Sequence, residues 1–399
     1  MMDVLLLLGL AILLGLSGGK SGKKLGSPLV VGYILIGVIL GASVLGIFQP
    51  DLVDKLDVVN YLALALIGFD IGGELSLDVL KKLGRSVSYI TFLEAFGAFT
   101  WVTLAVLLLT RKLYIALIFG ALACATAPAA TVDVLREYKT AGPLTSTVFA
   151  VVALDDAIAI IIYAFASAFA KISISGYEQI SFITIMSTPL MEIGGSILLG
   201  MLMGMVLGYV TRRTHDRNEL LILSLGSILI CTGLANMFHF SLILANMAMG
   251  MTLINLPLTD RRAFDVVSSV SPPIYVLFFV LIGARLRVDL LPAMGILGLT
   301  YILFRVTGKS IGSFLGARVS SAEEAVAKYL GFCLFSQAGV AIGLAVQAWH
   351  EFQAYGVEGY QLGLLAINVI AATTLIFQVI GPISTKFAVV KAGEVGKHA

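Results

Sequence analysis

Charged residues are scarce in this sequence of 399 residues. Asp, Glu, Lys and Arg together make up 13% of it, hydrophobic residues make up 59%, and the mean hydropathy is +1.00. Soluble domains carry about a quarter charged residues and about half apolar ones. The chain therefore lacks the polar residues needed to cover a soluble surface, and its composition favours a membrane protein over a soluble enzyme.

Cysteine, net charge and nucleotide-binding motifs are also sparse or missing. The three cysteines, Cys124, Cys231 and Cys333, lie inside apolar runs, and their odd number argues against a disulfide framework. A net charge of +2 gives no reason to expect a nucleic-acid partner. No glycine-rich phosphate loop ending in Lys and Ser or Thr is present, so we expect no nucleotide and no other cofactor. No histidine–glutamate metal pair or Ser/Lys nucleophile pair occurs deep in an apolar run, which argues against an intramembrane enzyme.

Long apolar runs dominate the sequence instead. A bilayer core about 30 Å thick needs roughly 20 apolar residues in a helix. By this measure we predict an all-α polytopic membrane protein with about thirteen transmembrane helices, including a retained first helix rather than a cleaved signal peptide. The expected spans lie near residues 2–18, 28–46, 56–73, 87–110, 113–135, 143–170, 188–211, 218–238, 241–256, 266–284, 290–317, 329–348 and 362–385.

The basic residues between these spans predict the orientation of the chain. If the N-terminus lies outside, the inner loops and tail hold eighteen lysines and arginines and the outer loops hold six. Cytoplasmic loops are typically richer in these residues, so we expect a multi-pass protein with a cytoplasmic C-terminus. Short inner loops and the absence of a targeting segment favour a prokaryotic inner membrane. The two remaining basic residues, Arg305 and Lys309, fall inside the eleventh span.

Two adjacent carboxylates, Asp155 and Asp156, lie in the middle of the sixth span. A charge in hydrocarbon costs about 2.5–3.5 kcal/mol on insertion scales, so an intramembrane charge points to function. Neighbouring residues on a helix point about 100° apart. One aspartate can therefore face a water-filled site while the other faces a protein partner. A buried carboxylate can hold either a proton or a small hard cation, whose preferred ligands are oxygens.

Two spans are interrupted at mid-depth. In the fifth span Pro128 predicts a break or kink, and the hydroxyls of Thr126 and Thr131 together with freed carbonyls are candidate cation ligands. The twelfth span carries Ser336, Gln337 and Gly339 at the corresponding place. A pair of interrupted helices in matching halves indicates an inverted-repeat transporter with its site near the membrane midplane.

The charged residues around these spans have candidate partners. Arg305 and Lys309 are four residues apart and share one helix face, which should meet carboxylates, with Asp155 the expected partner. Alternatively, Arg305 could reach the membrane interface by snorkelling. Glu94 in the fourth span is either part of a proton path or a partner for Arg305.

These patterns, taken in order, resemble the cation:proton antiporter superfamily, and within it the branch of bacterial sodium/proton antiporters and glutathione-regulated potassium-efflux transporters. The resemblance extends over essentially all thirteen spans. The segments that carry it are Ser27–Gly37, Gly68–Leu75, Thr126–Thr131, the pair Asp155 and Asp156, Phe278–Gly283 and Gly308–Gly312.

The resemblance implies a homodimer in which a dimerisation scaffold (spans 1–3 and 7–10) supports a mobile ion-carrying core (spans 4–6 and 11–13). It implies that Asp156 is the principal sodium and proton carrier and that Asp155 partners Lys309. Paired aspartates resemble the electrogenic sodium (or lithium)/proton members. One departure is that many relatives carry a glutamate near the position of Gly339, where this sequence reads Gln337, Ala338, Gly339.

We therefore expect residues 1–399 to form a single transmembrane transporter domain without a soluble regulatory domain. Its substrates would be a monovalent cation and protons, exchanged by alternating access, and its surroundings would be membrane lipid. Three other functions stay open at this point. They are potassium/proton exchange, a cation channel, and an organic-anion symporter with a similar crossed-helix plan.

Overall fold

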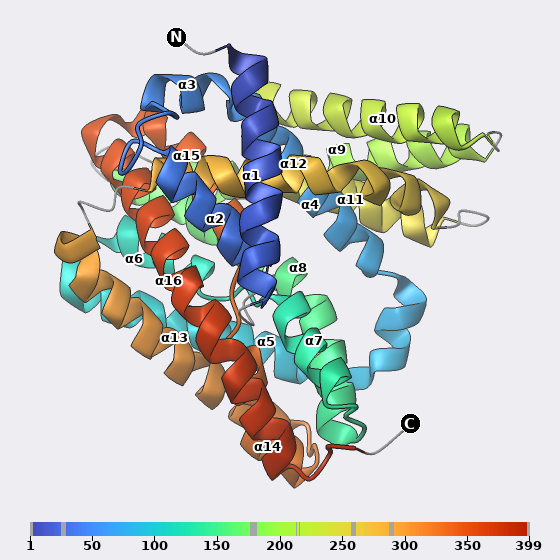
Figure 1. The fold of residues 1–399 in the computed structure, drawn as a ribbon. Helices are drawn as coiled ribbons and strands as arrows, with labels where there is room; N and C mark the ends of the chain where they lie inside the picture. Colours follow the sequence, from blue (N-terminus) through green and yellow to red (C-terminus); the bar gives the residue numbers. More distant parts are fainter. Residues whose placement is uncertain are drawn as a thin grey trace. The chain divides into compact units, whose positions relative to one another are not determined.

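The described residues form helices throughout the chain (Figure 1). A computed structural model describes residues 3–24, 29–175, 182–212, 214, 216–256, 261–286 and 291–396. Each of the thirteen predicted ranges contains helix, and the fifth and twelfth are each split in two. Seven helical segments among the described residues are long and apolar enough to cross a membrane, and three shorter apolar helices accompany them. The prediction of an all-helical membrane protein is therefore confirmed, whereas thirteen complete crossings remain a prediction.

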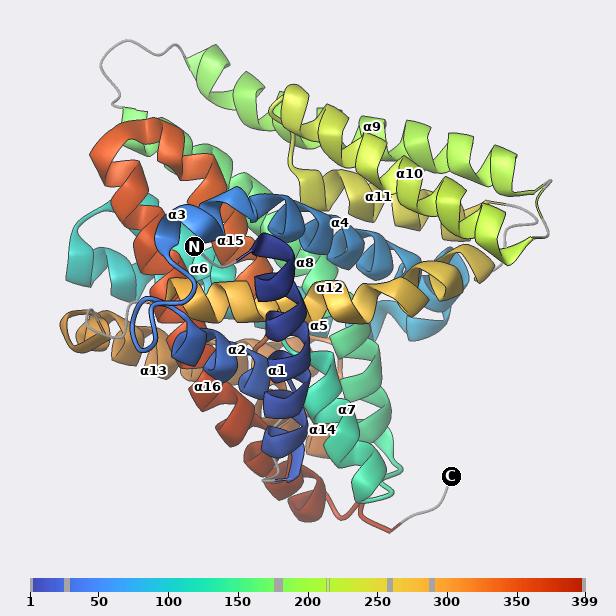
Figure 2. The ribbon, with the colours of Figure 1, turned by 45° about the horizontal axis from the view of Figure 1, so that its top comes forward.

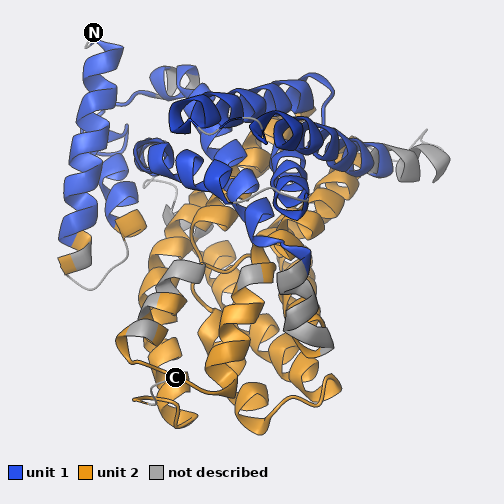
Figure 3. Ribbon diagram, turned by 90° about the vertical axis from the view of Figure 1, so that its right-hand side faces the viewer, with its two compact units in different colours: residues 1–21, 32–81, 178–285 blue, residues 22–31, 82–177, 286–399 orange. Residues whose placement is uncertain are grey.

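The chain divides into two compact units, shown in different colours in Figure 3. Unit 1 comprises residues 1–21, 32–81 and 178–285, and unit 2 comprises residues 22–31, 82–177 and 286–399. Unit 2 thus contains the spans expected to form the core, and unit 1 contains those expected to form the scaffold. The roles of scaffold and core remain predictions.

Unit 1 is built mainly from helices that pack closely against one another. Within it α9, α10 and α11 run side by side (Figures 1 and 2). Its helices, some of which continue into unit 2, are α1 Val4–Lys24, α2 Leu29–Leu40, α3 Pro50–Lys55, α4 Asp57–Glu74, α9 Phe182–Thr211, α10 Arg217–Met237, α11 Leu242–Asn255 and α12 Arg262–Arg285.

Unit 2 contains the two interrupted spans and the long helices that surround them. Its elements, the first of which begins in unit 1, are α5 Leu77–Thr110, α6 Leu113–Leu122, α7 Pro128–Glu137, α8 Pro143–Ser175, α13 Leu291–Val319, α14 Glu324–Tyr329, the 3-10 segment Leu330–Leu334, α15 Gly339–Phe352, the 3-10 segment Gln353–Tyr355 and α16 Gly356–Lys391. The short helices α3 and α14 were not predicted, because each has only six residues.

Several helix starts follow directly from local sequence. Helices α3, α7 and α8 each begin with a proline, which has no N–H to satisfy and a backbone angle suited to the first helical position. In α10 and α11 the preceding Asp216 and Ser241 accept hydrogen bonds from backbone N–H groups of the first turn.

The start of α8 is additionally capped from the far end of the chain. The Glu394 carboxylate accepts hydrogen bonds from the backbone N–H groups of Leu144 and Thr145, both at 2.8 Å, and from the Thr145 hydroxyl at 2.6 Å. Glu394 is only 3% exposed. A carboxylate at a helix N-terminus satisfies N–H groups that have no partner within the helix and interacts favourably with the helix dipole. The segment that follows α16 thus holds the N-terminal end of α8, the helix that carries Asp155 and Asp156.

Glycine permits close backbone approach within each unit. In unit 1 a Cβ atom on Gly37 of α2 would lie against the carbonyl oxygen of Val280 in α12. In unit 2 a Cβ atom on Gly312 of α13 would lie against the carbonyl oxygen of Leu93 in α5. The second approach places α13 directly beside the turn of α5 that carries Glu94.

We expect Gly37→Ala to lower the free energy of unfolding by about 1–3 kcal/mol, because the added methyl group overpacks the contact between α2 and α12. Gly226→Ala in α10 is the matched control, since nothing lies within 4 Å of its Cβ position. A helix interior gains stability from this control change. Thermal unfolding in detergent measures both variants, and equal midpoints for the two would contradict the packing.

Candidate functional site

Unit 2 contains two helix breaks that contact each other. The first, residues 123–127, separates α6 from α7, and the second, residues 335–338, separates the 3-10 segment Leu330–Leu334 from α15. The backbone N–H of Ala127 donates to the carbonyl of Ser336 at 2.9 Å. The Thr131 hydroxyl donates to the carbonyl of Cys333 at 2.9 Å. The breaks therefore lie where Pro128 and Gly339 predicted them, and they are joined by hydrogen bonds.

Gln337 holds the second break against the end of α6. Its side-chain amide donates to the carbonyl of Leu122 at 2.9 Å and to the Tyr301 hydroxyl at 2.8 Å. The backbone carbonyl of Gln337 accepts a hydrogen bond from the side-chain amide of Gln378 in α16 at 2.8 Å. Gln337 thus acts as a neutral structural link between α6, α13 and α16. Ser336 is fully buried beside it, so the two polar residues predicted here both lie inside the unit.

Arg305 binds backbone carbonyls of both breaks that have no partner within a helix. Its guanidinium donates to Ala123 at 3.1 Å and Ala125 at 2.7 Å in the first break, and to Phe335 at 2.7 Å in the second. A longer contact of 3.4 Å reaches Ser336. Carbonyl groups freed by a helix break have no water to bind within a bilayer, so they need donors from the protein. The planar five-donor guanidinium can serve two segments at once.

Two expectations about Arg305 are wrong. It pairs with no carboxylate among the described residues, because its donors are taken by backbone carbonyls. It does not snorkel to an interface either, since it is 0% exposed and its guanidinium lies 4.5 Å from the centre of the Phe377 ring. The guanidinium is placed by the breaks and by this aromatic face.

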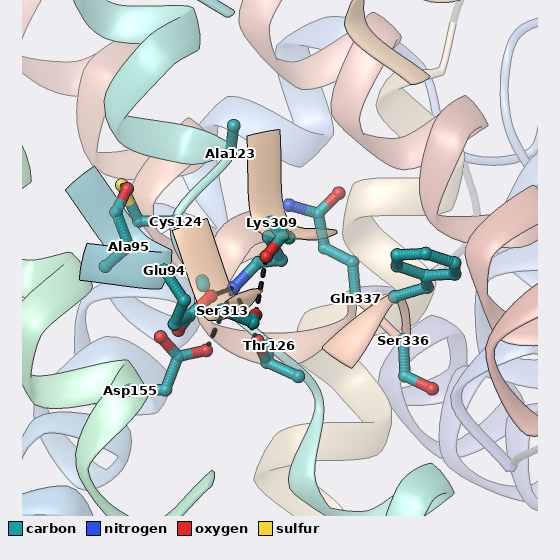
Figure 4. A network of polar contacts seen from close by, with 12 residues as sticks. Glu94, Ala95, Ala123, Cys124, Thr126, Asp155, Lys309, Ser313, Ser336 and Gln337 are labelled. Atoms are coloured by element: carbon teal, nitrogen blue, oxygen red, sulfur yellow. Dashed lines mark hydrogen bonds and ion pairs between the residues drawn. The ribbon is translucent and has the colours of Figure 1, made fainter. Parts of the chain in front are cut away.

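Lys309 lies at the centre of a cluster of polar side chains (Figure 4). Its ammonium group contacts Glu94 at 2.8 Å, the Thr126 hydroxyl at 2.8 Å and Asp155 at 3.3 Å. Lys309, Glu94 and Asp155 are each 0% exposed. The cluster draws these residues from α5, the first break, α8 and α13, so one buried ammonium joins four segments of unit 2.

The cluster contradicts one of the two roles expected for Glu94, that of a partner for Arg305, and it contains the expected pair of Asp155 with Lys309. Glu94 partners Lys309 rather than Arg305, and at 2.8 Å it is nearer to the ammonium than Asp155 is. The two carboxylates also lie against each other. Sequence spacing could not reveal this arrangement, because the approach of α5 to α13 depends on the small residues at their contact.

Asp156 lies beside this cluster without joining the ion pairs. It is 7% exposed, and its carboxyl group is next to the backbone of Thr126. Among the described residues, one oxygen of Asp156 and one of Asp155 are buried without a hydrogen-bond partner. Buried polar atoms nearly always have a partner in proteins, so these oxygens are suited to a proton or a cation.

The predicted threonines have different roles. Thr126 is 3% exposed and accepts a hydrogen bond from Lys309, so it belongs to the cluster. Thr131 of α7 instead donates its hydrogen bond to Cys333 in the 3-10 segment before the second break. No group of three or more His, Cys, Asp or Glu side chains in the described part of the chain is arranged as a ready metal site.

Tyr301 and Phe377 were missed by sequence reasoning. The Tyr301 hydroxyl accepts a hydrogen bond from the Gln337 amide, and the Phe377 ring packs against the Arg305 guanidinium. The signal for Tyr301 was present, because residues 301, 305 and 309 recur every four positions and therefore share one face of α13. No signal in the sequence pointed to Phe377, which comes from a different helix.

Comparison with known proteins assigns the chain to a family. The family described as sodium/hydrogen exchanger, transmembrane, matches residues 8–391. The chain belongs to the sodium/hydrogen exchanger family. It is therefore a multi-pass membrane transporter and not an enzyme, as the sequence predicted.

Known proteins resemble the chain over nearly its full length. An Na(+)/H(+) antiporter of Enterococcus hirae is 22% identical over 365 residues, covering 90% of this chain and 92% of that protein. The ammonium/H(+) antiporter subunit AmhT of Alkalihalophilus pseudofirmus is 25% identical over 385 residues, covering 95% and 94%. The structure of the sodium proton antiporter MjNhaP1 from Methanocaldococcus jannaschii at pH 8 has a TM-score of 0.78 at 21% identity, covering 98% of each chain. This structural likeness shows that the exchanger fold is shared.

We expect Arg305→Lys to lower the free energy of unfolding by at least about 2 kcal/mol, because a compact ammonium lacks the planar fork of donors that reaches Ala123, Ala125 and Phe335 together, and charged hydrogen bonds contribute about 1.5–3 kcal/mol each. Arg318→Lys on the same helix is the control, since Arg318 lies at the end of α13 over the Phe314 ring. Thermal unfolding in detergent compares them. Equal stability of the two variants would contradict a bridging role for Arg305.

Proposed function

We propose that this exchanger family member moves sodium or lithium against protons, electrogenically and by alternating access, with Asp156 as the ion carrier. The observation that supports this is the position of Asp156. It has an unpartnered carboxyl oxygen beside a buried cluster of one ammonium and two further carboxylates. A carboxylate so placed can hold one cation or one proton, and competition between the two couples their movements.

The oxygen atoms around Asp156 are suited to a small hard cation. Asp155 contributes an unpartnered carboxyl oxygen, and the Thr126 hydroxyl, which accepts a hydrogen bond from Lys309, lies on the adjacent segment. Monovalent hard cations prefer such oxygen ligands. In this proposal sodium is the transported substrate, held by Asp156 and Asp155, and it is not a resident metal.

The formal charges give a reason why the core should not move across the membrane while its ion site is empty. With every group ionised, Lys309 and Arg305 carry two positive charges and Glu94, Asp155 and Asp156 carry three negative ones. One bound cation or proton makes this group neutral. Since a buried unpaired charge in a bilayer is costly, the core would move easily only when loaded.

The adjacent carboxylates provide a second place for a proton. Glu94 and Asp155 share the ammonium of Lys309, so a proton can be held within this triad in addition to one on Asp156. A cycle that returns two protons for each sodium ion moves one net charge, because the group is neutral with one sodium ion bound and carries one net positive charge with two protons bound. The electrogenic mode follows from this second acceptor.

The larger design is proposed on the same basis. Unit 2 would be the mobile core with two inverted repeats that cross at the breaks, and unit 1 would be the scaffold of a homodimer. The N-terminus would lie outside and the C-terminus in the cytoplasm, as the loop charges predict. Potassium or ammonium is the alternative substrate. A relative of this chain is named an ammonium/H(+) antiporter subunit, and the same oxygen ligands could hold a larger monovalent cation.

We expect Asp156→Asn to reduce sodium-driven proton movement in sealed proteoliposomes to the level of protein-free liposomes, because an amide holds neither the proton nor the cation charge. Asp265→Asn is the control, since Asp265 is an exposed residue in the first turn of α12. Sodium, lithium, potassium and ammonium are compared in the same assay. Full activity of Asp156→Asn, or proton movement with no cation dependence, would exclude Asp156 as the carrier and favour the channel or anion-symporter alternatives.

We expect exchange to respond to the membrane potential. One net charge per cycle is worth about 2.3 kcal/mol per 100 mV, so an imposed potential of about 100 mV should shift the balancing sodium gradient roughly 50-fold. Potassium and valinomycin set the potential in proteoliposomes while the sodium gradient at zero flux is measured. A balancing gradient independent of potential would show an electroneutral exchanger and would remove the second proton from the cycle.

A further inference from the structure

A line of polar side chains runs along α8 away from Asp156. Asp156, Tyr163, Ser167 and Lys171 follow one another at intervals of seven, four and four residues, so they lie on one face of the helix. Tyr163 and Ser167 are each 1% exposed. The rest of this part of α8 is mostly apolar, including the run of isoleucines from 160 to 162. A polar file on an otherwise apolar helix requires an explanation beyond packing.

This file ends on a carboxylate contributed by α15. Glu351 accepts a hydrogen bond from the Ser167 hydroxyl and lies 3.1 Å from the Lys171 ammonium. The Gln347 amide, one turn earlier on α15 and 3% exposed, donates to its other oxygen. The side chains of Lys171 and Glu351 are each 16% exposed. The carboxylate is thus tied to buried hydroxyl and amide groups on one side and is partly accessible on the other.

The two helices that meet at Glu351 both reach the ion site: α8 passes it, and α15 begins beside it. Helix α8 carries Asp155 and Asp156, and α15 starts at the second break, where Gln337 and Ser336 lie. The side chains of a helix lean towards its N-terminus. This direction favours a Tyr163 side chain that points back towards Asp156 and a Ser167 side chain that points back towards Tyr163. The interval from Asp156 to Tyr163 is about 10 Å along the helix axis, part of which the tyrosine side chain covers.

We propose that Glu351 exchanges protons between the solution at the C-terminal end of α8 and Asp156, with Tyr163 and Ser167 as relay groups. This inference rests on the proposed function of Asp156. Protonated Glu351 gives its proton towards Ser167 and Tyr163, each hydroxyl accepting one proton and passing on another, and Asp156 changes from carboxylate to carboxylic acid. Glu351 then takes a new proton from solution. Water held by the polar side chains of this file completes the intervals.

The other charged groups at this end of unit 2 define the setting of Glu351. Helix α8 faces it with Lys171, and its own helix carries the neighbouring His350. At the adjoining ends of α6 and α16, Lys112 and Glu358 form a separate exposed pair at 2.9 Å. Glu358 is thus a carboxylate at the same end of the unit that is engaged with a lysine and lies outside the polar file.

The experiment compares Glu351→Gln, Tyr163→Phe and the control Glu358→Gln in right-side-out and everted membrane vesicles, so that pH is varied on one face at a time. The pH is raised on the membrane face where α8 ends, so that protons become scarce on that face. We expect the maximal exchange rate of Glu351→Gln and Tyr163→Phe to fall about tenfold or more relative to the parent protein, because a positioned proton carrier accelerates transfer by such factors. The KM for sodium measured from the opposite face should stay the same, and Glu358→Gln should match the parent protein.

Three other results would overturn the proposal. Parent-like rates and pH dependence in both Glu351→Gln and Tyr163→Phe would show that no proton passes this way. If Glu351→Gln lowers the thermal unfolding midpoint and the rate alike at every pH while Tyr163→Phe is silent, Glu351 only clamps α8 to α15. Sodium-independent proton movement in the parent protein would instead remove the proposed exchange itself, so failure of the relay and failure of the function are distinguished.

Discussion

The need to satisfy every charge and every freed carbonyl inside the protein is the constraint on which the rest of this structure depends. Two helices are broken at membrane depth, and a bilayer offers no water to bind their carbonyls. Arg305 supplies donors to both breaks, and Lys309 one turn later pairs with Glu94 and Asp155. Both basic residues are fully buried, so neither can be removed without leaving its partners uncompensated.

Arg305 and Lys309, two basic side chains of different shape, have different roles in this arrangement. The planar guanidinium of Arg305 has a structural task, because it binds fixed backbone oxygens and lies on an aromatic ring. The compact ammonium of Lys309 binds carboxylates that can take up protons. The hydrogen bonds of Arg305 to the breaks therefore involve no carboxylate, and the carboxyl groups of the site lie around Lys309 and Asp156.

Membership in the sodium/hydrogen exchanger family coexists with sequence identities near 20–25% to the relatives described above. A helical membrane fold tolerates such divergence because most positions need only be apolar, while glycines at close contacts and a few buried polar groups define the packing. Gln337 forms neutral hydrogen bonds to Leu122 and Tyr301, and the carboxylates described at this site belong to α5 and α8.

The sequence by itself determined the class of protein, the location of the helices and both breaks, because apolar length, proline and buried charge act locally along the chain. It also predicted functional roles for Asp155, Asp156, Arg305 and Lys309, all of which are buried in the structure. The partners of those residues were decided only by the tertiary structure. Which carboxylate reaches Lys309, and whether Arg305 meets an acid or a carbonyl, depends on how closely α5, α8 and α13 approach one another. That approach is a property of packing between distant segments, and spacing along one helix carries no record of it.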